Sequence, residues 1–258
     1  MMATASAIAP EREREGWSVF GEDLALLARL HDREVDASLI ESLRTAPVAD
    51  WFALKISGET FERGADLLSQ ALLLAPLPMT GAALDEMAAE YAAIYLNHTY
   101  RISPCESFWT GDDGLERQDA MFSVRSCYAR LGFRAPNWRM RPDDHIALEL
   151  SFLAQAAPRL GEEEVLRIVA EFMRAHMLVW IPDFAGRVAR RCLSPFYAGA
   201  ALLTVAYLEN LASALQGCFG FDMTPIQPEK TPLTMPQGQT STCADPPPRY
   251  ALGSGPGW

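Results

Sequence analysis

Paired cysteines and a secretion signal are both missing from this sequence. Five cysteines are scattered along the 258 residues, and no two of them form a Cys-x-x-Cys pair. An odd number of isolated cysteines fits free thiols in a reducing compartment better than a framework of disulfides. The first residues, MMATASAIAPEREREGW, lack both the basic segment and the apolar segment of a secretory signal. We therefore expect a cytoplasmic protein.

Long apolar runs and an excess of positive charge are also absent. No stretch reaches about 18 continuous apolar residues, so we expect neither a transmembrane helix nor stable membrane insertion. The net charge is −11, which disfavours nucleic-acid binding because phosphates require Lys and Arg. Residues 21–90 hold 13 acids and 5 bases. Such a field attracts a cationic peptide, although solubility is a simpler explanation of acidic charge.

Strand-like patterns are nearly absent, whereas apolar residues recur at helical spacing from Trp17 to about Phe221. In FGEDLALLARL, for example, Phe20, Leu24 and Leu27 fall on one stripe. Ala, Leu, Arg, Glu and Met, which favour helices, dominate the composition of this region. The sequence therefore predicts a single all-α globular domain over residues 17–223.

Three segments interrupt or flank this domain. Residues 1–16 are small or charged, and we expect a flexible N-terminus. Two prolines in residues 134–142 indicate a linker, and a possible hinge, between an N-terminal and a C-terminal group of helices. Residues 224–258 contain eight prolines and four glycines with few large apolar side chains. Such a tail buries too little surface to offset its chain entropy, so we expect it to be disordered or extended.

The most polar cluster of the chain stands directly before an apolar helical run, in RMRPDDHIALELSF at 139–152. Asp143 and Asp144 fit a helix N-terminus, where carboxylates accept hydrogen bonds from free backbone N–H groups. His145 and Glu149 are spaced i, i+4 and share a helix face. The alternative is a metal-dependent hydrolase centred on these four residues, although no HExxH or paired ExxH motif supports it. The third possibility is a docking point for a partner.

Five segments, in order along the chain, carry a resemblance to a known family. They are YAAIY (91–95), ISPCESFW (102–109), RPDDHIALELSFLAQ (141–155), HMLVWIPDFAGRV (176–188) and SPFYAGAALLTVAYL (194–208). This set resembles the TorD/DmsD family of cytoplasmic chaperones for molybdenum-containing redox enzymes, the redox-enzyme maturation proteins. The resemblance covers roughly residues 20–216. It implies an all-α fold of roughly ten helices, with no catalytic residue and no metal or cofactor of its own.

The family's motifs fall on particular residues of this chain. The aromatic-x-x-Leu-Phe motif falls on 91–95, the Pro-x-Glu-Ser-aromatic-aromatic segment on 104–109, and Glu-Pro-x-Asp-His on 141–145. Arg141 stands where the family has Glu, which reverses the charge at that position. The resemblance associates Asp144 and His145 with binding of the leader peptide. The further candidates for leader binding in this chain are Trp109, Glu106, Phe108, Tyr91, Tyr95 and Pro142.

The resemblance also implies the partners. Family members bind the twin-arginine signal peptide and the apo-molybdoenzyme catalytic subunit, assist cofactor insertion and proofread the client before export. A leader that is basic and then apolar needs carboxylates beside an apolar groove, and Asp144 and Glu106 are candidate acceptors for its guanidinium groups. On this hypothesis, Asp144→Ala or His145→Ala weakens leader binding while the helix content stays nearly intact. If either change unfolds the protein, the residue acts as a helix cap instead. With the hinge at 134–142, the resemblance implies a monomer or a domain-swapped homodimer.

Structural roles remain open for the same residues. Tyr91 and Tyr95 are spaced i, i+4 and fit a helix core, and Glu106 fits the cap of a turn. Phe108 and Trp109 lie in an irregular link, where large aromatic side chains commonly fix a loop to the core.

Overall fold

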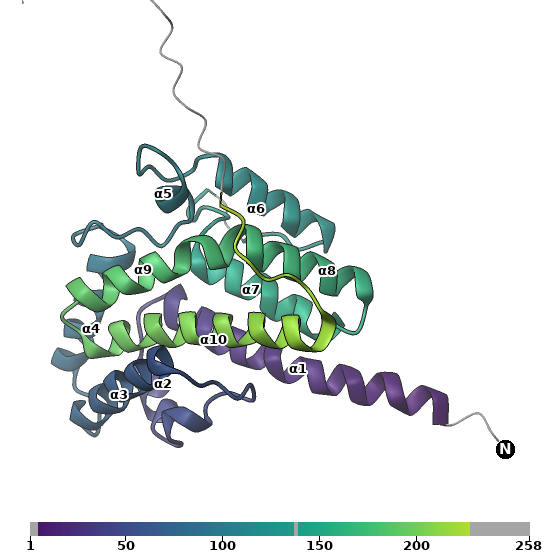
Figure 1. The fold of residues 1–258 in the computed structure, drawn as a ribbon. Coiled ribbons are helices and arrows are strands. Elements are labelled where there is room, and N and C mark those ends of the chain that lie inside the picture. The colour runs from purple at the N-terminus through teal and green to yellow at the C-terminus, as the bar shows by residue number, and fades with distance from the viewer. Residues whose placement is uncertain (1–4, 137–138, 228–258) are drawn as a thin grey trace, which may run out of the picture. The chain divides into compact units, whose positions relative to one another are not determined.

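The structure, a computed structural model, describes residues 5–136 and 139–227, with side chains from Trp17 onward (Figure 1). Within those ranges it contains helices and no strands, so the predicted all-α fold is confirmed. The helices are α1 (Ala5–Asp32), α2 (Ala37–Leu43), η1 (Val48–Asp50), α3 (Glu59–Leu74), α4 (Gly81–Tyr95), α5 (Ser107–Thr110), α6 (Asp119–Arg130), α7 (Ile146–Ala156), η2 (Ala157–Arg159), α8 (Glu163–Phe172), the π-helical turn η3 (Met173–Met177), α9 (Leu178–Arg191) and α10 (Pro195–Phe219).

Helix α10 lies at the centre of the described region, between α9 and α3 (Figure 1). By length and composition it is the one described helix apolar enough to cross a membrane, yet 78% of that apolar window is buried inside the protein. Its apolar residues therefore face other helices, as expected of a core helix.

The contact between α10 and α3 depends on two glycines. A Cβ at Gly199 would lie 2.8 Å from the carbonyl oxygen of Gly64 and 2.8 Å from Cγ of Leu68. A Cβ at Gly64 would lie 3.1 Å from Cβ of Leu202. The two helix backbones therefore approach each other more closely than side chains at these positions would allow.

A second layer, made of α1 and α7, packs beside α10 and leads to an aromatic cluster. The rings of Tyr128, Phe133, Phe152 and Phe172 lie with centroids 4.7 to 6.0 Å apart, mostly in tilted or edge-to-face arrangements. Such pairs are favoured by the ring quadrupoles. This cluster joins α6, α7 and α8 and supports the segment 141–146, where the predicted polar cluster lies.

The cap of α7 is His145, which corrects the expectation that Asp143 and Asp144 cap this helix. The His145 backbone is extended, and its Nδ1 accepts a hydrogen bond from the backbone N–H of Ala147 at 3.1 Å. The two aspartates bind elsewhere, because Asp143 pairs with Arg125 and Asp144 with Ser107. A neutral imidazole nitrogen thus accepts the backbone hydrogen bond that a carboxylate or hydroxyl oxygen commonly accepts at a helix N-terminus.

The predicted domain boundaries meet the structure in different ways. Helix α1 begins at Ala5, well before the predicted boundary at Trp17, while the flexibility of 1–16 stays a prediction. At the other end, the Ile226 N–H donates to the carbonyl oxygen of Arg174 at 2.9 Å, and Arg174 Nε donates to the carbonyl of Thr224. Residues 228–258, most of the predicted tail, lie outside the described residues. Residues 137–138 of the predicted hinge lie outside them too, so chain exchange about 134–142 stays a prediction.

Candidate functional site

Two motif segments that are distant in sequence run side by side in the structure. The N–H of Glu106 donates to the carbonyl oxygen of Asp144 at 2.9 Å, and the N–H of Ile146 donates to that of Pro104 at 2.8 Å. These bonds form an isolated antiparallel bridge between Cys105 and His145. The segments 102–109 and 141–146 thus build one site.

Asp144 is fully buried in this site. Its Oδ2 accepts a hydrogen bond from the backbone N–H of Ser107 at 2.8 Å and another from the Ser107 hydroxyl, while Oδ1 has no partner. Burial raises the pKa of the Asp144 carboxyl, and the bonds from Ser107 oppose that rise. Asp144 therefore holds the start of the short helix α5, and neither of its oxygens reaches the surface in this structure. Its role as an acceptor for guanidinium stays a prediction.

Glu106 is also buried, and its side chain forms a hydrogen-bonded pair with His176. The Nδ1 of His176 lies 2.9 Å from Oε2 of Glu106, and both side chains are almost inaccessible to solvent. Burial raises the pKa of the Glu106 carboxyl, and the imidazole opposes this shift. Burial lowers the pKa of His176, but the hydrogen bonds with Cys127 and Glu106 outweigh it and raise that pKa to about 9. His176 was not among the residues singled out from the sequence.

Glu149 completes a group of three buried carboxyls. Its Oε2 accepts a hydrogen bond from the indole N–H of Trp180 at 3.3 Å, and its Oε1 has no partner. Burial, followed by the charges of Glu106 and Asp144, raises the pKa of the Glu149 carboxyl well above its usual value. A protonated Glu149 is the state that costs least in such surroundings.

These groups do not form a metal site. Among the residues that the structure describes, no group of three or more His, Cys, Asp or Glu side chains is arranged to hold a metal ion. Asp143 pairs with Arg125 at 2.5 Å, Asp144 with Ser107, His145 with the N–H of Ala147, and Glu149 with Trp180. The arrangement does not support the alternative of a metal-dependent hydrolase centred on these four residues.

Replacing His176 with glutamine is expected to lower the free energy of unfolding by about 2–3 kcal/mol near pH 6, and by much less at high pH. The folded-state pKa of His176, about 9, lies above its ordinary 6.5. Its stabilising contribution is therefore complete below pH 6.5 and is lost as the pH rises through 9. Urea unfolding of both proteins across this range measures the difference. An equal loss at both ends would show that the Glu106 partner is a neutral imidazole.

Four of the eight predicted residues line one pocket of about 290 Å³: Tyr91, Tyr95, Pro142 and His145. The two tyrosine rings stack with centroids 4.6 Å apart, and both residues are buried. They therefore belong to the core and also form part of the pocket wall. The exposed apolar side chains of Leu96 and Met140 also line this pocket.

Glu116 supplies the accessible carboxylate of this pocket, and sequence reasoning missed it. Its side chain is 29% exposed, accepts a hydrogen bond from the Ser103 hydroxyl at 2.6 Å and lies 3.5 Å from Nε2 of His98. His98, Arg101 and Arg117, near the pocket, all have a backbone φ between 52° and 61°. Non-glycine residues adopt this left-handed conformation only at a cost, and such residues concentrate at functional sites. Neither the contact nor the φ values have a signal in a single sequence.

Phe108 and Trp109 lie toward α9, and neither lines this pocket. The Trp109 indole N–H donates to the carbonyl oxygen of Ser103 at 2.9 Å, and the guanidinium of Arg187 lies 4.2 Å from the centre of the Trp109 ring. Trp109 thus already has a cation on its face, supplied by the chain itself. The structure divides the predicted site into a pocket, two buried carboxylates behind it, and this aromatic pair.

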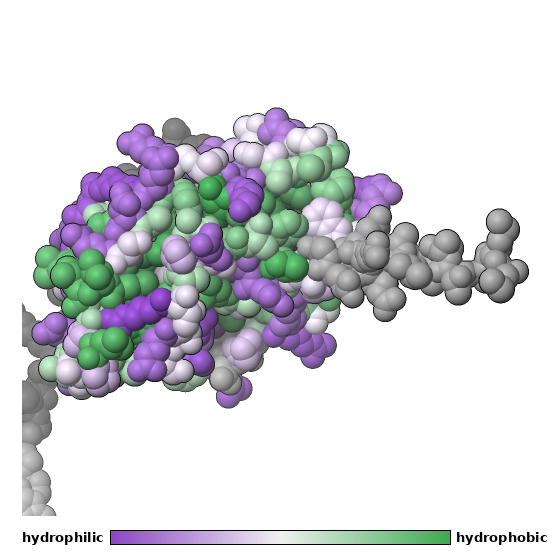
Figure 2. Space-filling view, turned by 90° about the horizontal axis from the view of Figure 1, so that it is seen from below, coloured by the Kyte–Doolittle hydropathy of each residue, from purple (hydrophilic) through white to green (hydrophobic). Residues whose placement is uncertain are grey.

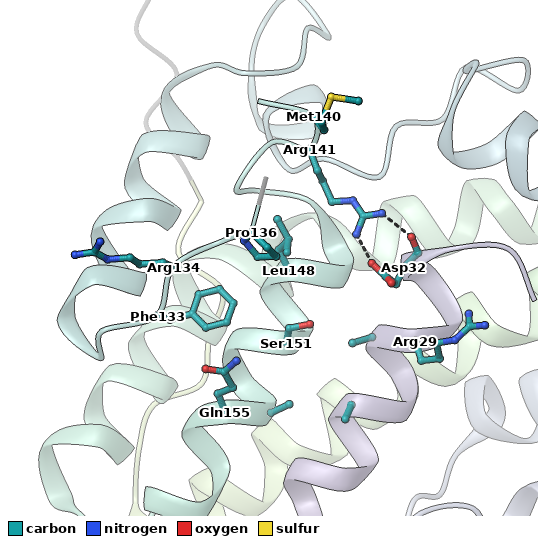
Figure 3. A pocket seen from close by; sticks show the side chains of 13 residues that line it. Arg29, Asp32, Phe133, Arg134, Pro136, Met140, Arg141, Leu148, Ser151 and Gln155 are labelled. Atoms are coloured by element: carbon teal, nitrogen blue, oxygen red, sulfur yellow. Dashed lines mark hydrogen bonds and ion pairs between the residues drawn. The ribbon is translucent and has the colours of Figure 1, made fainter. Parts of the chain in front are cut away.

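A larger pocket of about 850 Å³ adjoins the first, between α1 and α7 (Figure 3). Phe133, Leu148 and Ser151 are among its lining residues, and Met140 and Arg141 line both pockets. Arg141 points toward the end of α1, where it binds the Asp32 carboxylate and donates to the Asp32 carbonyl oxygen at 2.6 Å. Asp32 therefore balances the charge that Arg141 brings to a motif position where the family has Glu.

The fold and the site together define a class of protein. The protein has pockets lined by apolar side chains, an accessible carboxylate and loop residues in the left-handed conformation. The buried ionisable groups hold the segments around these pockets in place. These features define the class of all-α proteins with concave pockets of the kind that ligands and peptides occupy. The sequence pattern of the family described as nitrate reductase delta subunit matches residues 58–186, half of the chain. The chain belongs to this family.

Individual relatives agree with that assignment. The chain is 26% identical over 198 residues to the chaperone protein TorD of Shewanella loihica, covering 74% of this chain and 90% of that protein. It is 24% identical over 196 residues to the chaperone protein TorD of Vibrio parahaemolyticus, covering 73% and 90%. A crystal structure described as that of a redox enzyme maturation protein from Archaeoglobus fulgidus matches with a TM-score of 0.45 and 20% identity, over 73% of this chain and 93% of that one. The family match and the two chaperones named TorD confirm the resemblance to TorD-like chaperones.

Proposed function

We propose that this chain is a cytoplasmic chaperone for a molybdenum-containing oxidoreductase. In this proposal it binds the twin-arginine leader and the apo form of its client and holds the client until the molybdenum cofactor is inserted. Membership of the family and similarity to proteins named as TorD chaperones support the class. The chaperone itself performs no covalent step.

The observation that carries the proposal is the pocket formed by Tyr91, Tyr95, Pro142 and His145 around an accessible carboxylate. A twin-arginine leader presents guanidinium groups followed by an apolar stretch. Glu116 is positioned to accept hydrogen bonds from an arginine, and carboxylate–guanidinium pairs are strong and directional. Leu96 and Met140 offer exposed apolar surface in the same pocket for the residues that follow.

The remaining predicted residues receive a positioning role in this proposal. Asp144 fixes the start of α5, and the pair of Glu106 and His176 fixes the segment 104–109 against η3. Trp109 and Phe108 hold Arg187 on the α9 side. None of these groups needs to touch the leader for its replacement to weaken binding.

Replacing Glu116 with glutamine is expected to weaken binding of a synthetic twin-arginine leader peptide about tenfold, since one charged hydrogen-bonded pair contributes on the order of 1.4 kcal/mol. Titration calorimetry measures the affinity, and circular dichroism checks the fold. Raising the salt concentration should weaken binding to the wild-type protein more than to the variant, because only the wild type forms the ion pair.

Glu163→Gln is the matched control, because it removes the same charge from an exposed position on α8. It should leave leader binding almost unchanged. Equal effects of Glu116→Gln and Glu163→Gln, or no effect of either, would remove this pocket as the leader site.

A further inference from the structure

Three leucines at the end of α3 form an exposed apolar surface, the leucine patch: Leu73, Leu74 and Leu77. Their exposed fractions are 84%, 74% and 77%. Single exposed leucines are ordinary, but three within five residues form a contiguous surface of the kind that marks an interaction site. Figure 2 shows hydrophobic residues gathered toward the left of this face, the side on which α3 and its link to α4 lie in Figure 1.

A groove of about 520 Å³ runs beside the leucine patch, between α3 and the segment 43–48. Its lining includes Leu43, Val48, Leu72, Leu73 and Leu77. The groove lies apart from the pocket around Glu116 and shares no lining residue with it.

Arg44 also lines the groove, and its guanidinium group is bound to backbone carbonyl oxygens of the protein itself. Its guanidinium donates to the carbonyl oxygen of Leu72 at 2.9 and 3.1 Å, to that of Pro76 at 3.3 Å, and to that of Ala75. The Leu72 and Ala75 carbonyl groups lie at the C-terminal end of α3, where a helix leaves acceptors without partners. Arg44 therefore satisfies these three backbone acceptors beside the apolar wall of the groove, and its charge is not available there to a partner.

The part of the sequence that contains the groove is acidic. Residues 37–90 contain eight Asp or Glu and three Lys or Arg, and one of those three is the internally bonded Arg44. Asp50 belongs to the same short helix as Val48, and Asp66 lies one helical turn before the groove residue Ser69. Both side chains are exposed, and within the described part of the chain neither carboxylate has a hydrogen-bond or ion-pair partner.

We propose that the leucine patch and its groove form a second docking surface, which binds a polypeptide segment with apolar side chains on one face and Lys or Arg on the other. Leucines bury the apolar face, and unpaired carboxylates meet the cations at the rim. A second copy of this chain would bring an equally acidic surface against this one, which is unfavourable. An anionic membrane surface is repelled for the same reason.

This inference rests on the proposed function only in that the bound partner is a polypeptide, and the two sites are separable by mutation. The probe is a fluorescein-labelled helical peptide with leucine on one face and lysine on the other. Its matched partner has glutamate in place of every lysine. Fluorescence anisotropy reports binding, at low salt and again at about 0.3 M salt, where charge interactions are screened beyond a few ångströms.

The wild-type protein should bind the lysine peptide more tightly than the glutamate peptide. The double variant Leu73→Ser/Leu77→Ser should lose about tenfold or more in affinity, because it removes the apolar anchor. Phe122→Ser is the control, since Phe122 is an exposed large apolar residue on α6, away from α3 in Figure 1, and should change nothing. Asp50→Asn/Asp66→Asn should reduce the salt dependence. Glu116→Gln should leave this peptide's binding intact.

Several results would overturn the proposal. Two concern the peptides: unchanged affinity of Leu73→Ser/Leu77→Ser for the lysine peptide, or equal binding of the lysine and glutamate peptides to the wild-type protein. Two concern other occupants: a wild-type dimer that the two serine substitutions dissociate, or binding to phosphatidylserine vesicles that depends on the same leucines. A protein whose twin-arginine leader binding still responds to Glu116→Gln while the lysine peptide fails to bind would refute this inference and retain the proposed function.

Discussion

Alanine in place of Gly199 is expected to lower the free energy of unfolding by about 1–3 kcal/mol, even though alanine favours helices over glycine by about 1 kcal/mol. The added Cβ would stand 2.8 Å from the Gly64 carbonyl oxygen and 3.0 Å from the backbone nitrogen of Leu68. Backbone atoms of a packed helix cannot yield without moving α3 away from α10. The apolar contacts along the whole crossing would then loosen.

Gly217 is the matched control in the same helix, because a Cβ there meets nothing within 4 Å. Gly217→Ala should therefore stabilise the protein by up to about 1 kcal/mol through helix propensity alone. Urea unfolding of the three proteins, compared at their midpoints, measures both changes. If both alanines stabilise the protein, the close approach of α3 and α10 is not required for its packing.

Alanine in place of Asp144 is expected to lower the free energy of unfolding by about 2–4 kcal/mol. The change removes the acceptor of both the Ser107 N–H and the Ser107 hydroxyl in a fully buried place. A buried donor without a partner costs more than the original hydrogen bond contributed. We therefore expect any loss of leader binding in Asp144→Ala to follow from disorder of the segment 104–109. Direct binding of the leader by Asp144 predicts the same loss with helix content nearly intact.

Asparagine is the control at this position. Asp144→Asn keeps one carboxamide oxygen as an acceptor for Ser107 and removes a buried carboxyl group whose pKa is already raised. Its loss of unfolding free energy should therefore be at least about 1 kcal/mol smaller than that of Asp144→Ala. Thermal unfolding followed by circular dichroism compares the two variants. Equal stability of Asp144→Ala and the wild-type protein would show that the bonds to Ser107 do not hold this segment.

Much of the fold was predictable because helical periodicity is a local property. The stripe of Leu24 and Leu27 in α1 is buried as its spacing indicates, and so are Tyr91 and Tyr95 in α4. The start of α7 was located correctly, but its cap was not. Asp143 and Asp144 are suitable caps by residue type, whereas histidine is not a preferred N-cap. Distant partners, Arg125 and Ser107, engage the two aspartates, and His145 caps the helix.

The candidate site was predictable only in part. The ordered motifs placed Tyr91, Pro142 and His145 together, and these residues do line one pocket. The acidic member of that pocket, Glu116, stands in an irregular link with no motif around it. The pairing of His176 with Glu106 was not predictable, because the two residues are 70 positions apart in the chain.

By itself, the sequence determined that this chain folds into helices, which faces of those helices are apolar, and which family it resembles, since each of these depends on residue type and short-range spacing. Only the tertiary structure decided which carboxylates meet solvent. Glu106, Asp144 and Glu149 lie inside, whereas Glu116 reaches a pocket and Asp50 and Asp66 reach the surface. The reason is physical, because the packing of segments far apart along the chain determines whether an acidic side chain is buried. In the sequence, a buried Asp or Glu looks the same as an exposed one.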